Sequence, residues 1–421
     1  MTQTLETGGA GRRRLFDRDF GLWFVARSVS VGGTAASAVA LPLLVYRSSA
    51  SPALTAAVVG LEAVPYLLFG LLAGAVADRR PRRRMMIVAD LSCALILLTV
   101  PVARAAGTLS PWHVLAVAFG VGCGFCWFDA AAWGAFARLA GRSRITRANS
   151  LIWATEIILE IAAPAAAGLL AAVADPSAVL AVDAVTYLVS AALIARIRTN
   201  LDAAPDPAVA AGGPARRLRA EIAEGWRHLW GLPIVRTLTV AGFGLNLAVG
   251  GVLGLLIVHA DKALGLSPGD RRLGLLYAAG AVGSLVAAVL LPRVSRWAGQ
   301  GAVSIGGLAV FVLAVAGLAG ASTFAVALVM WAVWAVARLT VNANGITVRQ
   351  LLTPDALQGR VNTTGRMIAW GGTPFGALLG GLVADTAGVR VAYLVLAVPA
   401  AISLIALLAS PVRTLRLPVP G

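Results

Sequence analysis

The stretch Gly74-Ala-Val-Ala-Asp78-Arg79-Arg80-Pro81-Arg82-Arg83-Arg84 decides the fold of this chain. It lies between two apolar segments, 53–77 and 85–103, and each of them holds a single ionisable residue. Both segments are long enough to cross a bilayer as helices, and a short basic turn between two such helices belongs on the cytoplasmic side. The stretch therefore predicts a tight cytoplasmic hairpin within a multi-pass membrane protein.

The bulk composition indicates the same class of protein. Of the 421 residues, 59% are hydrophobic and only 13% are charged, and the mean hydropathy is +0.83. A water-soluble chain of this length needs far more surface charge, so the composition excludes a soluble protein. The apolar pattern predicts an all-α polytopic membrane protein with twelve transmembrane helices. The predicted spans are 20–45, 53–77, 85–104, 111–137, 150–172, 178–196, 234–259, 272–291, 301–320, 322–347, 361–384 and 390–410.

The basic residues predict the orientation of the chain. The formal net charge is +16, and all but one of the 35 basic residues are arginine. About 26 of them lie in the tails and loops on one side of the predicted spans, against about six on the other side. Because basic residues collect on the cytoplasmic side, we expect both termini in the cytoplasm and the chain in a bacterial plasma (inner) membrane. The charge thus indicates topology and contact with anionic membrane lipids, not a nucleic-acid partner.

The spans divide six and six around a cytoplasmic connection. The predicted units are a cytoplasmic N-terminal tail (1–19), an N-terminal six-helix bundle (20–196), a linker with an amphipathic helix (197–233), a C-terminal six-helix bundle (234–410) and a cytoplasmic tail (411–421). The amphipathic helix is predicted from apolar residues at helical spacing, which are Leu218, Ile222, Trp226 and Leu229. Five residues of the first half have identical counterparts 213 positions later: Arg80, Arg83, Arg147, Asn149 and Gly168. Such duplication is typical of transporters built from structural repeats.

Three segments carry a resemblance to a known family. They are Gly74 with Asp78-Arg79, Arg147–Leu151 with Pro164 and Gly168, and Gly359–Asn362 with Pro374. Together they resemble the major facilitator superfamily of secondary transporters, in the branch of enterobactin exporters and macrolide-efflux proteins. The hairpin departs from the family pattern at Pro81, where the family usually has glycine.

The resemblance implies two six-helix bundles around a central cavity, alternating access, and export of a small amphipathic molecule, drug-like or siderophore-like, in exchange for protons. Two other functions stay open: import or proton symport by the same fold, and a membrane sensor or scaffold that does not transport. The sequence has no Walker loop, and its three histidines show no metal-ligand spacing. We therefore predict no enzyme, cofactor or metal site. The expected partners are a small-molecule substrate, protons and lipids, and a monomer suffices.

Acidic residues inside the spans are candidates for proton coupling, because a carboxylate in the bilayer is costly unless it is paired or hydrated. All of them fall in the first half: Glu62, Asp90, Asp129, Glu156, Glu160 and Asp183. Glu156 and Glu160 are one turn apart on one helix face, so they hinder each other's ionisation. We predict proton coupling at Glu156, Glu160, Asp129 and Glu62. For the Glu156–Glu160 pair, structural pairing with Arg27 or Arg366 is the alternative, and Asp183 is expected to hydrogen-bond between packed helices.

The resemblance implies that the first, fourth, seventh and tenth spans line the cavity. Aromatic faces beside a buried charge suit amphipathic or cationic ligands. The predicted cavity residues are Arg27, Trp127, Asp129, Asn246, Trp331, Trp334, Arg338 and Asn342. The last four share one face of the tenth span by their spacing, and packing against lipid is the alternative for that face.

The basic hairpin provides the candidates for gating. Asp78 is expected to accept hydrogen bonds from a neighbouring helix N-terminus and to pair with an arginine, which would hold the cytoplasmic ends of the halves together. The resemblance implies that Gly74, Asp78, Arg79 and Arg83 stabilise the outward-facing state. Asp90, near the cytoplasmic end of the third span, is expected to balance the arginine cluster and completes the gating set.

Glycines at four-residue spacing mark a close helix contact in the eleventh span. They are Gly372, Gly376 and Gly380, and we expect them to let neighbouring backbones approach.

Overall fold

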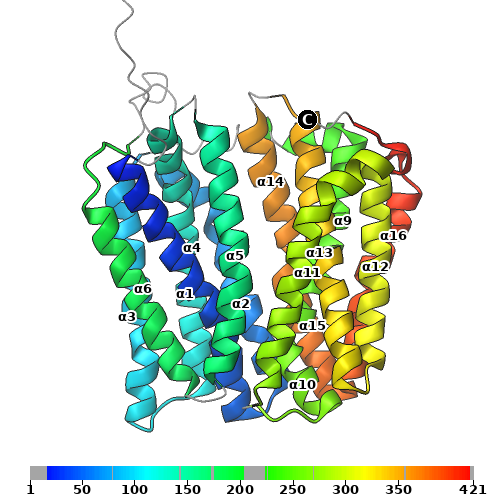
Figure 1. Cartoon of the computed structure of the whole chain (residues 1–421), viewed down its shortest axis with the longest axis horizontal. Coiled ribbons are helices and arrows are strands. Elements are labelled where there is room, and N and C mark those ends of the chain that lie inside the picture. The colour runs from blue at the N-terminus through cyan, green and yellow to red at the C-terminus, as the bar shows by residue number, and fades with distance from the viewer. Residues whose placement is uncertain are drawn as a thin grey trace, which may run out of the picture.

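The computed structural model describes residues 17–77, 79–141, 144–171, 175–202, 223–224, 226–268, 270–354 and 357–417. These residues are almost entirely helical, and no β-strand occurs among them. The helices of the first half stand beside those of the second half, with their axes roughly along one direction (Figure 1). The predicted all-α fold is confirmed.

Each half is built from long helices. In the first half they are α1 (Arg18–Ser49), α2 (Pro52–Ala77), α3 (Arg82–Ala105), α4 (Pro111–Ala140), α5 (Ile145–Ala171) and α6 (Pro176–Ala195). In the second half they are α9 (Pro233–Gly254), α10 (Leu256–Leu264), α11 (Arg272–Ala298), α12 (Gln300–Gly320), α13 (Phe324–Leu352), α14 (Gln358–Trp370), α15 (Gly372–Ala387) and α16 (Val389–Leu408). A short 3-10 helix, η2 (Pro411–Thr414), follows.

The helices have the length and composition of membrane spans. Within the described residues, eleven helices are long and apolar enough to cross a bilayer, counting α14 and α15 together from Thr364. Helix α5 matches them in length with 27 residues and carries Glu156 in its middle. The chain is therefore a multi-pass membrane protein.

Side-chain caps explain where several helices begin. Asp17 accepts a hydrogen bond from the backbone N–H of Phe20 at 2.9 Å, and Ser110 and Asp175 serve α4 and α6 in the same way. Proline occupies the first position of α4 and α6, where its missing N–H costs nothing. These local signals determine where these three helices begin, independently of how the helices pack.

Helix α11 differs from its predicted span. It continues to Ala298, whereas the prediction ended at residue 291, so Arg293 and Arg296 lie on helix and not in a loop. Their side chains donate to carbonyl groups of Val289 and Pro292 one turn earlier in the same helix. Basic residues near a helix C-terminus are stabilised by the helix dipole, which favours this extension.

Two of the predicted spans are interrupted. Helix α9 gives way to α10 at Leu255, and α14 gives way to α15 at Gly371. Gly371 caps α14, and its backbone N–H donates to the carbonyl oxygen of Met367 one turn earlier at 2.9 Å.

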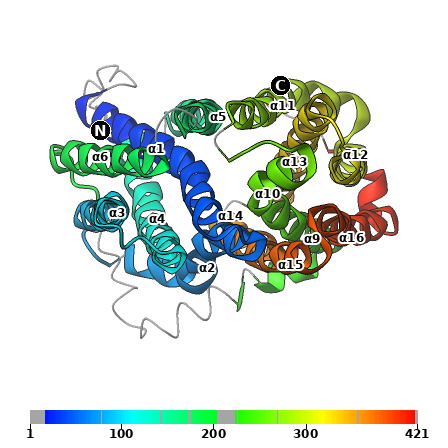
Figure 2. The same cartoon turned by 90° about the horizontal axis from the view of Figure 1, so that it is seen from below.

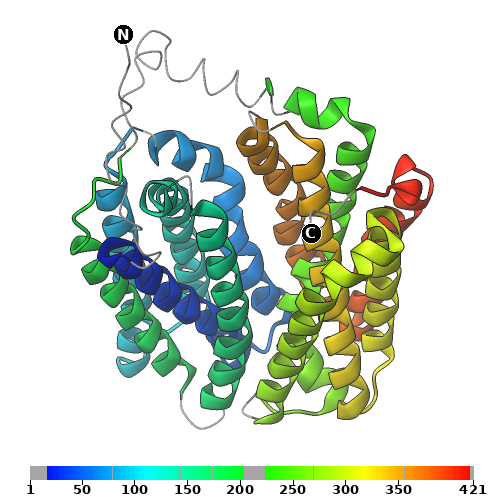
Figure 3. The same ribbon diagram turned by 45° about the horizontal axis from the view of Figure 1, so that its top comes forward.

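The two halves meet at one end of the molecule. Helix α2 packs on α15 and helix α5 packs on α11 (Figure 2). At this end the Tyr46 hydroxyl donates to Asp261 at 2.5 Å, and Asp385 accepts from the backbone N–H of Ala53 at 3.3 Å. Toward the other end, where α1 begins and α16 ends, the ribbons of the halves separate (Figure 3).

Close backbone approach accompanies the contact between the halves. A Cβ on Gly168 of α5 would come 2.8 Å from the Cα of Gly274 on α11. No side chain larger than hydrogen fits there without a shift, so α5 and α11 are in near-direct backbone contact.

The linker region is described only in part. Residues 226–231 are helical, with Leu229 buried and the exposed rings of Trp226 and Trp230 stacked at 4.5 Å between centroids. Leu218 and Ile222 of the predicted amphipathic helix lie outside the described residues, as do most of the N-terminal tail and Asp78.

Candidate functional site

A buried arginine forms the centre of a charge cluster in the first half. Arg27 lies in the N-terminal third of α1, and only 7% of its surface is exposed. The adjacent Ala26 and the preceding turn at Trp23 are also buried, so this face of α1 points into the bundle. An arginine so enclosed needs anionic partners.

Two carboxylates from different helices supply these partners. The Arg27 Nε donates to Glu156 Oε1 of α5 at 2.5 Å. The Arg27 Nη1 and Nη2 atoms approach Asp129 Oδ1 of α4 at 3.4 and 3.3 Å. Asp129 is 5% exposed and the Glu156 side chain 14%. One guanidinium therefore joins α1, α4 and α5.

Aromatic rings enclose the guanidinium. Its Cζ lies 5.1 Å from the ring centroid of Trp133 and 6.0 Å from that of Trp23. Trp133 follows Asp129 by one helical turn on α4, and both tryptophans contact the ring of Phe136 at centroid distances of 5.8 and 5.6 Å. The site thus combines one cation, two anions and electron-rich ring faces in a space nearly closed to water.

Counted over the described side chains, the cluster carries one excess negative charge when both carboxylates are ionised. In an interior of low dielectric an uncompensated charge is costly, so the site attracts a neutralising partner. Because α5 also packs on α11, a change at Glu156 acts on a helix that contacts the other half. This arrangement can link a binding event to a movement of the halves.

Of the predicted carboxylate pair, the structure describes the side chain of Glu156. The side chain of Glu160 lies outside the described residues, and Glu156 pairs with Arg27. Of the two interpretations of Glu156, the structure displays the ion pair. Glu62, on α2, is partly buried and lies apart from this cluster, near Asp183.

Trp127 does not share a site with Asp129, contrary to the prediction. The two residues are two positions apart on α4 and so point to nearly opposite faces of the helix. Trp127 lines a groove of about 640 Å³ between α2 and α3, whose floor is α4 and whose one end carries Arg80 and Arg84.

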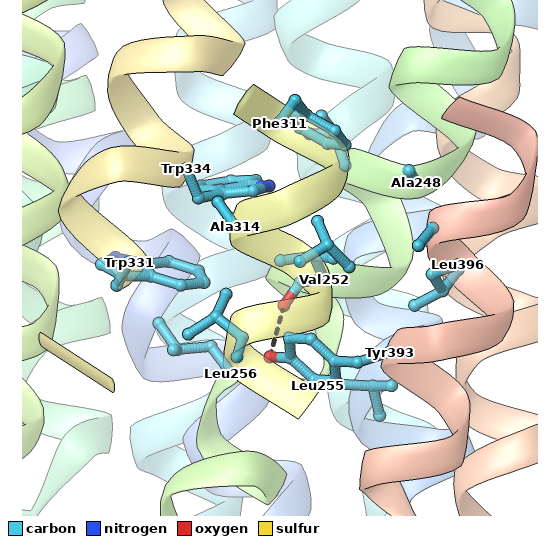
Figure 4. Close-up of a cluster of buried hydrophobic side chains, with 14 of the residues drawn as sticks. Ala248, Val252, Leu255, Leu256, Phe311, Ala314, Trp331, Trp334, Tyr393 and Leu396 are labelled. Atoms are coloured by element: carbon cyan, nitrogen blue, oxygen red, sulfur yellow. Dashed lines mark hydrogen bonds between the residues drawn. The ribbon is translucent and has the colours of Figure 1, made fainter. Parts of the chain in front are cut away.

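Trp331 and Trp334 belong to the packed core of the second half. They are 3% and 2% exposed, their rings stack at 4.6 Å, and Trp334 contacts Phe311 of α12 at 6.0 Å (Figure 4). Gly280 of α11 lies against the Trp331 ring. This corrects the prediction that both line an open cavity, because α11 and α12 cover that face of α13.

Two further predicted cavity residues contact groups on their own helices. Asn246 is 6% exposed and donates to the carbonyl oxygen of Gly242 on its own helix at 2.8 Å. Arg338 is partly buried, with its Cζ 5.5 Å from the Trp334 ring. Asn342 lines a small cavity of about 30 Å³ between α9, α13 and α14, together with Arg349 and Arg366.

An aromatic–arginine contact between the halves was not predicted. The Arg366 Cζ of α14 lies 4.5 Å from the Trp370 ring and 5.5 Å from the ring of Tyr66 on α2, and the two rings are 5.7 Å apart. The spacing of Arg366 and Trp370, one helical turn, was the available signal. Only the tertiary structure brings Tyr66 to them.

The gating residues contact their own half in this conformation. Arg83 donates to the carbonyl oxygen of Ala195 at the end of α6, and Arg79 is exposed. A Cβ on Gly74 would meet nothing within 4 Å. The most enclosed member of the hairpin is instead Arg82, 8% exposed, which donates to carbonyl oxygens including that of Gly134 at 3.0 Å.

Asp90 does not balance the arginine cluster, which corrects the prediction. It lies two turns into α3, is fully buried against α6, and neither carboxyl oxygen has a hydrogen-bond partner among the described residues. The helix turns Asp90 to the same inner face as Met86 and Cys93, away from exposed Arg84.

The described residues contain no group of three His, Cys, Asp or Glu side chains close enough to hold a metal ion. The chemistry available in the interior is therefore that of carboxyl groups, arginines and aromatic rings.

The chain is a multi-pass membrane protein whose first half encloses an ion-paired cluster. The chain belongs to the Major Facilitator Superfamily, whose family model matches residues 23–371. It is a transporter by family, and this family is not enzymatic.

Named relatives are drug efflux proteins. The chain is 28% identical over 374 residues to "Multidrug efflux pump Tap" of Mycolicibacterium fortuitum, which is 87% of this chain and 89% of that protein. It is 30% identical over 391 residues to the protein of the same name in Mycobacterium tuberculosis (strain ATCC 25618 / H37Rv), or 89% of each chain.

Solved structures share the fold at low sequence identity. A bacterial homologue of the human lysosomal transporter Spinster, described as inward-facing and unoccupied, has a TM-score of 0.73 at 15% identity, covering 98% of this chain and 100% of that one. The nucleoside transporter NupG has a TM-score of 0.73 at 13% identity, covering 94% and 99%. A bacterial homologue of ferroportin, in an inward-facing state, has 0.68 at 19%, covering 93% and 98%.

Proposed function

We propose that this chain exports small amphipathic molecules, lipophilic cations among them, from the bacterial cytoplasm in exchange for protons. The similarity to two efflux pumps over most of the chain supports export. The observation that carries proton exchange is the Arg27–Asp129–Glu156 cluster, whose excess negative charge is enclosed in the first half.

Orientation follows from the basic residues. With both termini in the cytoplasm, the end where Tyr46 meets Asp261 faces outward and is closed. The conformation is then inward-facing, with the halves apart on the cytoplasmic side (Figure 3).

A proton on Glu156 gives a simple coupling step. The neutral carboxyl group loses its ion pair with Arg27, and the guanidinium is then held by Asp129 alone. Helix α5 is thereby freed from α1 and can shift against α11 of the other half. A cationic substrate beside Asp129 competes for the same negative charge, so proton and substrate exclude each other.

The aromatic wall suits the substrate class. Trp133 lies beside the charges and is only partly buried, and a ring face binds cationic or flat amphipathic molecules without demanding one hydrogen-bond pattern, whereas Trp23 is packed in the core behind the guanidinium. A broad range of substrates follows from such a surface.

The test uses purified full-length protein in liposomes with an imposed pH gradient. Tetraphenylphosphonium, an aromatic drug and a catecholate siderophore serve as transported probes. Asp129→Asn and Glu156→Gln are each expected to reduce gradient-driven flux by at least about tenfold. Asp270→Asn, which removes a carboxylate outside the membrane core, is the matched control and is expected to transport normally.

Each other outcome contradicts a defined part of the proposal. If gradient-driven flux survives in both variants, the Arg27 cluster does not couple protons to transport. Movement of substrate in the same direction as protons makes the chain a symporter, and no flux of any probe favours a membrane sensor or scaffold.

A further inference from the structure

A second group of polar side chains is buried in the first half, outside the Arg27 cluster. It lies where α6 packs between α1 and α3, and we call it the polar seam. Its members are Thr34, Ser37, Asp90, Asp183, Tyr187 and Ser190.

Helix α6 supplies the central row of the seam. Asp183, Tyr187 and Ser190 follow one another by four and three residues, so they share one face. They are 1%, 2% and 0% exposed. From Asp183 to Ser190 the row extends along roughly 10 Å of the helix, a third of the bilayer core.

Helix α1 contacts this row through hydroxyl groups. The Ser37 Oγ donates to Asp183 Oδ2 at 2.5 Å, and Thr34 Oγ1 lies 2.8 Å from the Tyr187 hydroxyl oxygen. Gly33 makes the approach possible, because a Cβ there would lie 2.0 Å from Asp183 Oδ1. Asp183 thus has two neutral donors, Ser37 and Thr186, the latter at 2.9 Å.

Helix α3 adds a carboxyl group without a hydrogen-bond partner. Asp90 is fully buried, and neither of its oxygens is hydrogen-bonded within the described part of the chain. Ser190 faces it from α6 and can donate to it, although neither side chain has a hydrogen bond of ordinary geometry among those residues. A buried carboxylate in this position is strongly disfavoured unless a proton neutralises it.

No basic side chain compensates the seam. The titratable groups that face Asp90 and Asp183 are Cys93 of α3, Tyr187 of α6, Glu62 of α2 and the two aspartates themselves. From α1 the facing groups are uncharged hydroxyls, and α4 contributes Cys123 near Cys93. The described residues place no Arg, Lys or His in contact with either aspartate, so every ionisation adds unopposed negative charge.

We propose that Asp90 and Asp183 form a proton-binding site within the polar seam, separate from the substrate and Arg27. This inference rests on the proposed proton exchange and adds a second proton site to the one at Glu156. The Arg27 cluster has a cation fixed between its two carboxylates, whereas no cation among the described residues contacts the seam aspartates, so the seam offers a second place for a proton. Helix α1 carries both Arg27 and Ser37, so a change of protonation in the seam reaches the charge cluster through one rigid helix.

The first experiment reads protonation directly, without transport. Infrared difference spectroscopy of the purified full chain, between acidic and alkaline buffer, measures the carbonyl stretch of protonated carboxyl groups. Wild-type protein is expected to show this band at neutral pH, and Asp90→Asn and Asp183→Asn are each expected to remove part of it. If both variants keep the full band, the proposal is overturned, whatever the transport activity.

The second experiment separates coupling from substrate binding in proteoliposomes. Tetraphenylphosphonium counterflow without a pH gradient reports substrate movement, and gradient-driven accumulation reports coupling. Asp90→Asn is expected to lower accumulation at least about tenfold while counterflow changes less than about twofold. Equal accumulation in Asp90→Asn and wild type would make the seam a packing feature only.

The outcomes also distinguish this inference from the proposed function. If the wild type shows no proton-driven transport but keeps the neutral-pH carboxyl band, exchange fails and the seam stands as a proton site. If Asp183→Asn does not fold, the weaker Ser37→Ala is expected to shift the midpoint of the carboxyl band, and an unshifted midpoint counts against the proposal.

Discussion

The two halves of this protein share a fold but have different interiors. In the first half, α1, α4, α5 and α6 meet through charged and hydroxyl side chains, as between Arg27 and Glu156 or Ser37 and Asp183. In the second half, α13 meets α11 and α12 through stacked tryptophans, and α15 meets α9 through bare backbone. A polar interior can change its charge state and its hydrogen bonds, whereas an apolar core is bistable only at the cost of its packing. We infer that the first half holds the responsive elements and that the second half provides a rigid counterpart.

The largest test of this contrast is removal of the buried arginine. Arg27→Met leaves Asp129 and Glu156 without a counterion, which is expected to cost about 3–5 kcal/mol of stability and to abolish transport. Thermal unfolding in detergent measures the loss. Adding Asp129→Asn and Glu156→Gln to Arg27→Met is expected to restore most of the stability.

The matched control lies in the second half. Arg338→Met removes a guanidinium that stacks on Trp334, and a loss of about 0.5–1 kcal/mol is expected. Equal losses at both arginines would mean that the halves do not differ as described.

The next largest effect is expected from a comparison of two glycine substitutions. A Cβ on Gly376 would lie 1.6 Å from the carbonyl oxygen of Leu247, so Gly376→Ala is expected to destabilise the protein by about 1–3 kcal/mol. Gly74→Ala on α2 meets open space and is expected to be neutral or to stabilise the helix by up to about 1 kcal/mol. Unfolding midpoints compare the two. A large loss in Gly74→Ala would show that the hairpin end of α2 packs more tightly than described.

Two tryptophans separate packing from substrate contact. Trp334→Phe is expected to lower the unfolding midpoint and to leave the KM of transport unchanged, because Trp334 lies in the core. Trp133→Phe weakens the ring beside Arg27 and the acids, and we expect a rise in KM for lipophilic cations of about two- to fivefold. A KM change in Trp334→Phe but not in Trp133→Phe would support the prediction that this face of α13 lines the substrate cavity.

The smallest effect is expected at an exposed ion pair between α10 and α11. A hydrogen bond from the Arg272 side chain at 2.7 Å lowers the pKa of Asp270 from its ordinary value. A lowered folded-state pKa contributes stability above the unfolded pKa of about 4 and loses it as the pH falls through the folded value. Asp270→Asn is therefore expected to lower the unfolding midpoint slightly at neutral pH and not below about pH 3. A loss that persists in acid would indicate that the hydrogen bond from the backbone N–H of Arg272 to Asp270, and not the ion pair, supplies the stability.

The spans and the key charges could be read from the sequence. Helix α2 was predicted at 53–77 and is observed at Pro52–Ala77, because twenty or more apolar residues in a row allow little besides a membrane helix. Arg27, Asp129 and Glu156 were each singled out as costly in a bilayer, and they lie together. Pairing of Arg27 with Glu156 was one of two interpretations, and no sequence pattern distinguished them.

The directions of other side chains could not be read from the sequence. Helical spacing placed Trp331 and Trp334 on one face, which is correct, but not which neighbour covers that face. Trp127 and Asp90 were assigned by their nearness in sequence to Asp129 and to the arginines, and rotation about the helix axis separates them in space. Periodicity is relative to each helix alone and carries no information on its partners.

By itself the sequence determined that this chain is a duplicated bundle of membrane helices with its interior acids in one half. The reason is that the length of the apolar segments and the placement of charges are set by the bilayer, whatever the contacts between helices. Only the tertiary structure decided which of those acids meets an arginine and which meets none. That choice depends on contacts between helices more than a hundred residues apart, as with Arg27 and Glu156, and on whether a counter-charge reaches each buried group.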